Sequence, residues 1–211
     1  RSQEILKELR LTPLWRHRVE KPVNSIAKTP NSSVTKKEDR NFQILHSDWA
    51  QLEENVASCT SCSLCQDRTK TVFGAGDKNA DWLIVGDVPS AEEDTQGDPF
   101  IGLSGKLLDN MLEAVNLKRS SNIYIANIVK CGPSGNRNLD NSEVQQCEPF
   151  LIRQIELIKP KLIIVLGEIA AQNLLGTSAA IDSFRGRLHE YFGIPLIVTY
   201  HPAYLLRIQS D

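Results

Sequence analysis

Four short apolar runs recur along the second half of the chain, and amphipathic segments separate them. Continuous apolar runs of this length between turn residues are typical of strands buried on both faces. The runs predict four strands, at WLIVG (82–86), IYIANIV (123–129), KLIIVLG (161–167) and PLIVTYH (195–201). Between them, apolar residues repeat every three or four positions, which predicts helices over 104–117, 142–159 and 168–176.

The alternation of strands with helices predicts a parallel sheet with helices on both faces. Pro149 is expected to kink the second of these helices or to begin a helical segment within it. In open sheets of this kind, ligands bind beyond the carboxyl ends of the strands. The strand exits read GDVPS, NIVKC, GEIAA and YHPAY, and three of them carry unusual residues. We therefore expect one shared site there.

The N-terminal part of the chain lacks this regular pattern. Residues 1–16 predict a short amphipathic helix, whereas 17–45 are rich in Pro, Ser, Asn and Lys and predict a flexible linker. Ser47 is expected to cap a helix that runs through Trp49 and Val56. The organisation predicted is an N-terminal arm at 1–45, suited to binding a protein partner, and one domain at 46–211.

The composition is that of an ordinary globular protein. Of the 211 residues, 41% are hydrophobic and 24% are charged, and the net charge is −2. A near-neutral balance neither indicates nor excludes nucleic acid, because a basic groove can be hidden in the average. Since no apolar run approaches the roughly 20 residues that span a bilayer, we predict a soluble, cytoplasmic protein.

Five cysteines form the most distinctive chemical pattern. An odd number in a reducing compartment argues against a disulfide framework. Cys59 and Cys62 are separated by two residues, and Cys131 and Cys147 by fifteen, so that four thiolates are available for one metal centre. The wide second spacing favours a [4Fe–4S] cluster over a zinc ion, although both bind thiolates. Cys65 is expected to lie nearby as a spare thiol, with replacement of Cys62 as a ligand as the alternative.

Five motifs in one order carry a family resemblance. They are CTSCSLCQDRTKTVFGAGD, GDVPSAEEDTQGDPFIGLSGKLLD, IYIANIVKCGPSGNR, CEPFLIRQIELIKPKLIIVLG and FRGRLHEYFGIPLIVTYHPAYLLR. Together they resemble the iron–sulfur (family 4) uracil-DNA glycosylases of bacteria and archaea, from about residue 47 to Arg207. The resemblance implies a three-layer α/β/α fold around a four-stranded parallel sheet. It also implies excision of uracil from DNA by cleavage of the N-glycosidic bond, which leaves an abasic site.

The resemblance assigns four residues to recognition of a base that has been flipped out of the helix. Phe100 would stack on the base. The amide of Asn127 would accept from uracil N3–H and donate to O4, a pattern that cytosine reverses. The backbone at Val88 would contact the base edge, and Glu93 would line the pocket near C5 and help to exclude the methyl group of thymine.

Two further residues are expected to act on the reaction itself. His201 would donate to O2 as negative charge develops on the departing uracil. Asp87 would stabilise the positive charge that builds at C1′ and orient the attacking water. Family members usually carry Glu and Gly where this chain has Asp87 and Ser90. A carboxylate that retreats by about 1.5 Å can lower the rate about 10²-fold, so the alternative is a weakened or inactive relative that binds damaged bases.

The expected partner is uracil-containing DNA, single- or double-stranded, bound by a monomer. Tyr204 or Leu205 is a candidate wedge for the gap left by the flipped base. The candidate DNA-contacting cations lie in or near the motif loops, at Lys106, Lys130, Arg137, Arg185, Arg187 and Arg207.

Overall fold

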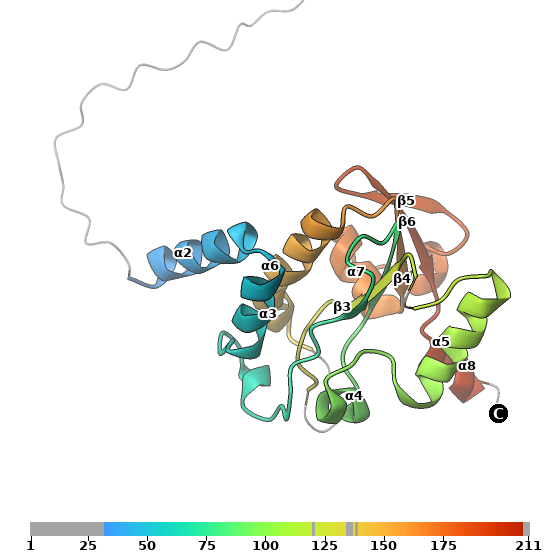
Figure 1. The fold of residues 1–211 in the computed structure, drawn as a ribbon, viewed down its shortest axis with the longest axis horizontal. Helices are drawn as coiled ribbons and strands as arrows, with labels where there is room; N and C mark the ends of the chain where they lie inside the picture. The colour runs from blue at the N-terminus through green and yellow to red at the C-terminus, as the bar shows by residue number, and fades with distance from the viewer. Residues whose placement is uncertain (1–31, 120, 134–136, 138, 209–211) are drawn as a thin grey trace, which may run out of the picture. The chain divides into compact units, whose positions relative to one another are not determined.

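The computed structural model describes residues 32–119, 121–133, 137 and 139–208, with side chains from residue 38 onward. Residues 36–211 form one compact unit, and the predicted helix at 1–16 lies outside the described residues. Figure 1 shows the arrangement. The helices are α2 (Ser32–His46), α3 (Trp49–Ala57), α4 (Ala91–Gln96), α5 (Gly102–Ala114), α6 (Asn141–Ile158), α7 (Glu168–Leu175) and α8 (Pro202–Ile208), with 3₁₀ turns η1 (Ser63–Cys65) and η3 (Ile181–Ser183).

One sheet organises the described residues. Its strands are β1 (Ala75–Gly76), β2 (Trp82–Gly86), β3 (Ile123–Asn127), β4 (Leu162–Leu166), β5 (Leu188–Tyr191) and β6 (Ile194–Thr199), in the order β1-β3-β2-β4-β6-β5. The four central strands are parallel, as predicted, and the edge strands β1 and β5 pair antiparallel with their neighbours. The sequence prediction therefore found the parallel centre and missed both edges.

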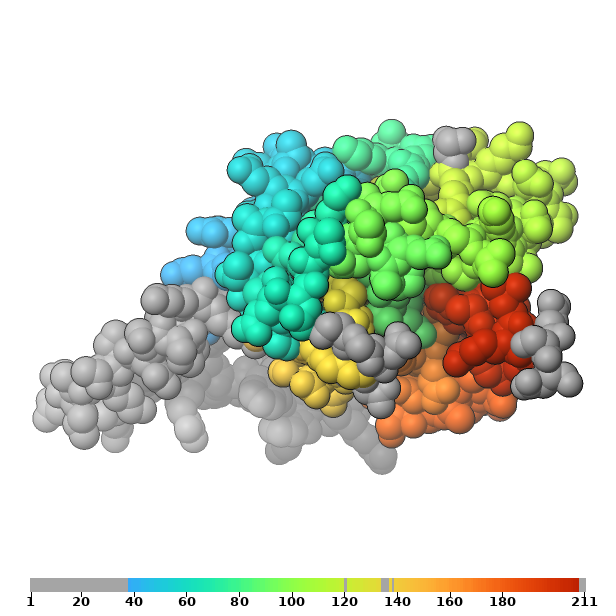
Figure 2. All heavy atoms as spheres, turned by 90° about the horizontal axis from the view of Figure 1, so that it is seen from below, coloured from blue at the N-terminus to red at the C-terminus, as the bar shows by residue number. Residues whose placement is uncertain are grey.

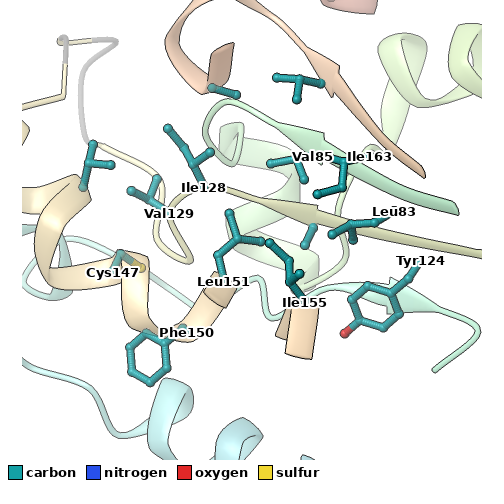
Figure 3. Packing of buried hydrophobic residues seen from close by; sticks show 14 of the residues in the cluster. Leu83, Val85, Tyr124, Ile128, Val129, Cys147, Phe150, Leu151, Ile155 and Ile163 are labelled. Carbon is teal, nitrogen blue, oxygen red and sulfur yellow. The ribbon is translucent and has the colours of Figure 1, made fainter. Parts of the chain in front are cut away.

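Alternate residues of the central strands feed two hydrophobic cores. Leu83 and Val85 of β2 pack with Leu151 and Ile155 of α6 on one face of the sheet, which Figure 3 shows from close by. Ile84, between them, belongs to the core that α5 covers on the other face. This division confirms the α/β class with helices on both faces of a mostly parallel sheet, because successive strand side chains point to opposite faces.

The structure corrects the reading of the segment before residue 46. The predicted linker at 17–45 is wrong over 32–45, where α2 is helical. Ile44 is buried, and the Arg40 guanidinium donates to the Gln146 carbonyl and lies over the Phe150 ring. These contacts join the end of α2 to α6. The polar composition that suggested a linker is that of a helix with a largely solvated surface.

Helix boundaries otherwise follow local signals. The predicted cap Ser47 is replaced by Asp48, whose side chain accepts from the Gln51 N–H while the Gln51 side chain accepts from the Asp48 N–H. Pro149 lies inside α6 rather than at its start. None of the helices within the described residues is both long and apolar enough to cross a membrane.

Candidate functional site

The carboxyl ends of the central strands lie in one row. Gly86 is in register with Asn127 on β3 and with Leu166 on β4, and Leu166 is in register with Thr199 on β6. The chain continues from this row into the loops that were predicted to share a site. Figure 2 shows the segment around α8, in red, beside α5 and beside the orange segment that follows β4.

Asn127 ends β3 as a buried amide without a partner. Its exposed fraction is 1%, and neither its Oδ1 nor its Nδ2 has a hydrogen-bond partner among the described residues. Leaving such groups unsatisfied costs about 1–3 kcal/mol each. A fully buried amide with one donor and one acceptor unused is therefore the mark of a site that a complementary ligand would complete.

Phe100 and His201 form a stacked pair beside this amide. The ring centroids are 5.2 Å apart and the ring planes differ by 26°. A Cβ placed on Gly86 would lie 2.5 Å from Asn127 Oδ1 and 2.6 Å from the Phe100 ring, so the amide and the ring meet at the glycine that ends β2. The structure thus brings three of the predicted residues together.

His201 is held as a neutral ring with a defined tautomer. The Ala203 N–H donates to Nδ1 over 3.1 Å, so the proton of the neutral imidazole lies on Nε2. Burial, with the nearby charge of Arg207 adding to it, lowers the pKa of His201 to about 4. At neutral pH the ring therefore offers Nε2–H as a hydrogen-bond donor and carries no charge.

Asp87 follows β2 directly and lies at the start of α7. Its Oδ1 accepts from the Ala170 N–H over 2.6 Å, and its carboxylate lies so close to Gly167 that a Cβ there would be 2.2 Å from Oδ2. Burial raises the pKa of Asp87 to about 7, with repulsion from Glu168 adding to it and the Ala170 hydrogen bond opposing it. The carboxyl group therefore changes charge within the physiological range.

A cavity opens beside Asp87, Val88 and His201. It has a volume of about 490 Å³, a size typical of small-molecule sites, and its far wall includes Tyr204 and Arg207 of α8. Phe100 and Asn127 do not line it themselves, but Phe100 stacks on the imidazole that does. The predicted residues thus form one continuous group at the ends of β2, β3 and β6.

Two backbone amides hold the carboxylate of Glu93. It is buried, one carboxylate oxygen accepts from the Ser90 N–H over 2.8 Å, and the other accepts from the Phe100 N–H. Ser90 caps α4 and accepts from the Glu93 N–H in return, which explains a serine at this position. These contacts let Glu93 support the Phe100 loop, and its predicted place near uracil C5 stays a prediction.

All five cysteines line a second cavity. Cys59 lies just after α3, Cys62 and Cys65 lie at η1, Cys131 follows β3, and Cys147 is on α6. The structure therefore unites the predicted ligands Cys59, Cys62, Cys131 and Cys147, and it places Cys65 with them. No three metal-binding side chains of the described residues converge closely enough to hold one ion.

Cations and N–H groups surround the cysteine sulfurs. Arg68 donates to Cys131 Sγ over 3.2 Å, the Lys130 N–H donates to Cys147 Sγ over 3.2 Å, and Arg40 lies 3.6 Å from Cys59 Sγ. Burial opposes the thiolate of Cys59, but hydrogen bonds from Ser61 and Arg40 outweigh it and lower its pKa. Burial instead raises the pKa of Cys62, Cys131 and Cys147, so among these four predicted ligands the surroundings favour the thiolate only at Cys59.

One of the predicted DNA contacts is wrong. Lys130 is buried, and its Nζ donates to the Asn127 carbonyl over 2.9 Å and to Gln154 Oε1 over 2.7 Å. Arg137 pairs with the buried carboxylate of Glu143 but is itself exposed, so its DNA contact stays a prediction. Sequence alone could not separate Lys130 from an exposed cation, because its positive charge is used inside the protein.

Comparison with known proteins decides the family. The model of the uracil DNA glycosylase superfamily matches residues 73–211. The chain belongs to this superfamily. It is 38% identical to the type-4 uracil-DNA glycosylase of Archaeoglobus fulgidus over 159 residues, 72% of this chain and 79% of the relative. It is 38% identical to that of Thermotoga maritima over 162 residues, 76% and 84% of the two chains, and 37% identical to that of Pyrobaculum aerophilum over 168 residues, 76% and 85%.

Two glycines of this superfamily member were missed as site residues. Gly86 leaves room for Asn127 and Phe100, and Gly167, at φ 114°, leaves room for Asp87. Each is the last residue of a predicted strand segment, WLIVG or KLIIVLG. A glycine at a strand end where ligands bind is the signal that could have identified them, because it permits close approach.

We expect 15N NMR of His201 to show a bare Nδ1 and a protonated Nε2 from pH 8 down to pH 5. Its pKa of about 4 lies below the ordinary 6.5, so the folded state disfavours the charged ring. This contribution to stability is present above pH 6.5 and is lost as the pH falls towards 4. A titration midpoint of His201 near 6.5 in the folded protein would contradict the assignment.

Proposed function

We propose that this chain is a DNA repair enzyme that excises uracil by hydrolysing the N-glycosidic bond of a flipped nucleotide. The observation that carries the proposal is the buried, unpartnered amide of Asn127 beside the Phe100 ring. Uracil offers N3–H as donor and O4 as acceptor on one edge, which is the complement of a carboxamide. The names of the type-4 relatives, uracil-DNA glycosylases, agree with it.

The ring geometry accounts for how a base is received. At a centroid distance of 5.2 Å, the imidazole is offset from the Phe100 ring and covers it only in part. A base stacked on the rest of that ring lies in the same layer as the imidazole. The Nε2–H of His201 then donates in the plane of the base, towards O2, the carbonyl on the other side of N3 from O4.

The two titrating groups fit the charges of the reaction. As the glycosidic bond breaks, negative charge develops on uracil O2, and a neutral imidazole N–H stabilises it by a hydrogen bond, with no change in the charge of the ring. Positive charge develops at C1′ of the sugar, where the carboxylate of Asp87 stabilises it and orients water. The low pKa of His201 matches an uncharged donor, and the raised pKa of Asp87 means that the carboxylate needed at C1′ predominates only above about pH 7.

DNA reaches the site over α8 and its neighbours. Tyr204 is exposed, lines the cavity beside His201 and is a candidate to fill the gap left by the flipped base. Arg207 lies on the same helix, and Arg185 lies over the Tyr200 ring at the other side of the cavity. With Lys106 and Arg187, these cations are the proposed contacts to the DNA backbone.

We further propose that Cys59, Cys62, Cys131 and Cys147 hold a [4Fe–4S] cluster. The donor set fits: four cysteines line one cavity, with Arg68 and Arg40 beside it, and four cysteines are the usual ligands of such a cluster. When bound, the cluster supplies a structural cross-link between α3, η1, the end of β3 and α6. Cys65 remains the spare thiol.

The decisive experiment measures release of uracil from single- and double-stranded oligonucleotides by cluster-loaded protein. We expect multiple turnovers, and a decrease of roughly 10²-fold or more in kcat/KM for Asn127→Ala, because the site loses its hydrogen-bonding complement to uracil. Asn173→Ala, which removes an exposed amide on α7, is the matched control and should keep wild-type rates. Binding of uracil-containing DNA without any cleavage by the wild type would instead indicate an inactive relative.

The pH dependence of kcat/KM tests Asp87. Because the carboxylate is the active form and its pKa in the free enzyme is about 7, the rate should rise with pH and level off above about 7. Asp87→Asn should lower the rate about 10²- to 10⁴-fold and remove this dependence, whereas the exposed Asp98→Asn should change neither. A wild-type profile that is flat from pH 5 to 8 would rule out this role.

Iron and sulfide analysis tests the cluster independently of activity. Cys65→Ser should retain about four iron atoms per chain and the visible absorbance of the cluster. Cys147→Ser should lose both and unfold at a lower temperature, since its thiolate comes from the helix that anchors the core. Loss of iron in Cys65→Ser with retention in Cys62→Ser would show that Cys65 is the ligand and Cys62 the spare thiol. One zinc ion per chain, without iron, would show that the site binds zinc instead of a cluster.

A further inference from the structure

Phe100 occupies a backbone conformation that an aromatic residue rarely adopts. Its φ of 52° lies in the left-handed region, where the Cβ of an L-residue crowds the following carbonyl. A strained conformation of this kind persists only where the surroundings hold it. The backbone at Phe100 also fixes where the side chain points, so whatever holds this conformation holds the stacking ring.

We propose that Arg119 is a positioning residue for uracil recognition, which it serves by clamping the backbone of Phe100 in this conformation. The inference rests on the proposed function, because it assigns the ring to base stacking. Arg119 lies ahead of β3, in the loop that follows α5, and none of the predicted site residues is near it in the sequence.

The guanidinium of Arg119 binds a set of backbone carbonyls around Phe100. Nη1 donates to the Pro99 carbonyl over 2.9 Å, and Nη2 donates to the carbonyls of Phe100 over 2.6 Å and Gly105 over 3.2 Å. Nε donates to Asp109 of α5, which fixes the plane of the fork. One planar group thus ties the Phe100 loop to the first turns of α5, as only a guanidinium with its rigid array of donors can.

The opposite side of the Phe100 peptide is held as well. The Glu93 carboxylate accepts from the Phe100 N–H, so the residue is bound at its N–H by an anion and at its carbonyl by a cation. Both contacts are charge-assisted hydrogen bonds, the stronger kind. Gly105 completes the clamp, because a Cβ there would lie 1.8 Å from the Phe100 oxygen.

Loss of the clamp has a defined consequence for the site. Without a donor on its carbonyl, Phe100 is free to relax to negative φ, and its ring then leaves Gly86 and His201. A displacement of about 1 Å of a substrate-positioning group can lower a rate about 10²-fold. Base binding should therefore suffer, whereas the proposed DNA-backbone contacts of Arg185, Arg187 and Arg207, which lie on other segments, should not.

The test uses the full-length, cluster-loaded protein and three measurements: uracil release, competitive inhibition by free uracil, and binding of abasic-site DNA. In Arg119→Met we expect kcat/KM to fall about 10²-fold and the inhibition constant of uracil to rise about tenfold, with abasic-DNA binding within twofold of wild type. Arg119→Lys keeps the charge but cannot serve all three carbonyls, so it should restore stability and leave uracil binding weak.

Arg153→Met is the matched control. Arg153 also donates to a backbone carbonyl, that of Ser47, and pairs with Glu156. Neither of these contacts involves Phe100. The control should show any general cost of removing a half-buried arginine without a change in uracil inhibition. If Arg119→Met is too unstable to purify, Gly105→Ala displaces the same carbonyl from the helix side and should weaken uracil inhibition in the same way.

A double-mutant cycle identifies the route of the effect. In a Phe100→Ala background, Arg119→Met should lower kcat/KM no further than twofold, because the ring that it positions is already absent. A fall in kcat/KM as large as the one that Arg119→Met causes in the wild-type background would overturn the inference. An active Arg119→Met protein with an unchanged inhibition constant for uracil would overturn it too. A wild type that releases no uracil would overturn the proposed function instead.

Discussion

The register of the four parallel strands is the constraint on which the site depends. Because Asn127, Gly86, Leu166 and Thr199 end their strands in one row, the residues that follow the row converge without any long loop. Asp87 lies one position after the end of β2, and His201 lies two positions after the end of β6. A shift of one residue in any of these pairings would turn that strand's side chains to the opposite face and separate the group. The two hydrophobic cores hold the register, since alternate residues of each strand are buried on opposite sides.

The same burial that stabilises the sheet sets the chemistry at its edge. Desolvation disfavours charge, so it raises the pKa of Asp87 to about 7 and lowers that of His201 to about 4. In each case one backbone N–H orients the group, from Ala170 for the carboxylate and from Ala203 for the imidazole. Close packing makes this possible, and it requires glycine at Gly86 and Gly167. The titration properties of the two groups thus follow from where the strands end rather than from unusual residues.

Sequence analysis recovered what periodicity and side-chain type determine. β2 was predicted with its observed bounds because a continuous apolar run is unambiguous, and Asn127 and His201 were identified at strand ends. β1 and β5 were missed, since one is only a dipeptide and the other, LHEY, carries little apolar pattern. Lys130 was misassigned for another reason. Its ammonium donates to the nearby Asn127 carbonyl and to the Gln154 side chain on α6, and no local pattern reveals whether a charged side chain faces inward.

The buried Lys130 lies between the cysteine cavity and the end of β3 that carries Asn127. Five consecutive residues join them: Asn127 at one end, Cys131 at the other, and Lys130 bonded to the Asn127 carbonyl in between. The described residues give this ammonium no carboxylate partner, and an isolated buried charge is very costly. Burial lowers the pKa of Lys130 to about 8 and raises that of Cys147, and in each case the opposite charge of the other group counteracts the shift. If the proposed cluster binds Cys147 as a thiolate, Lys130 keeps its charge and its hydrogen bond to the strand end from which Asn127 projects.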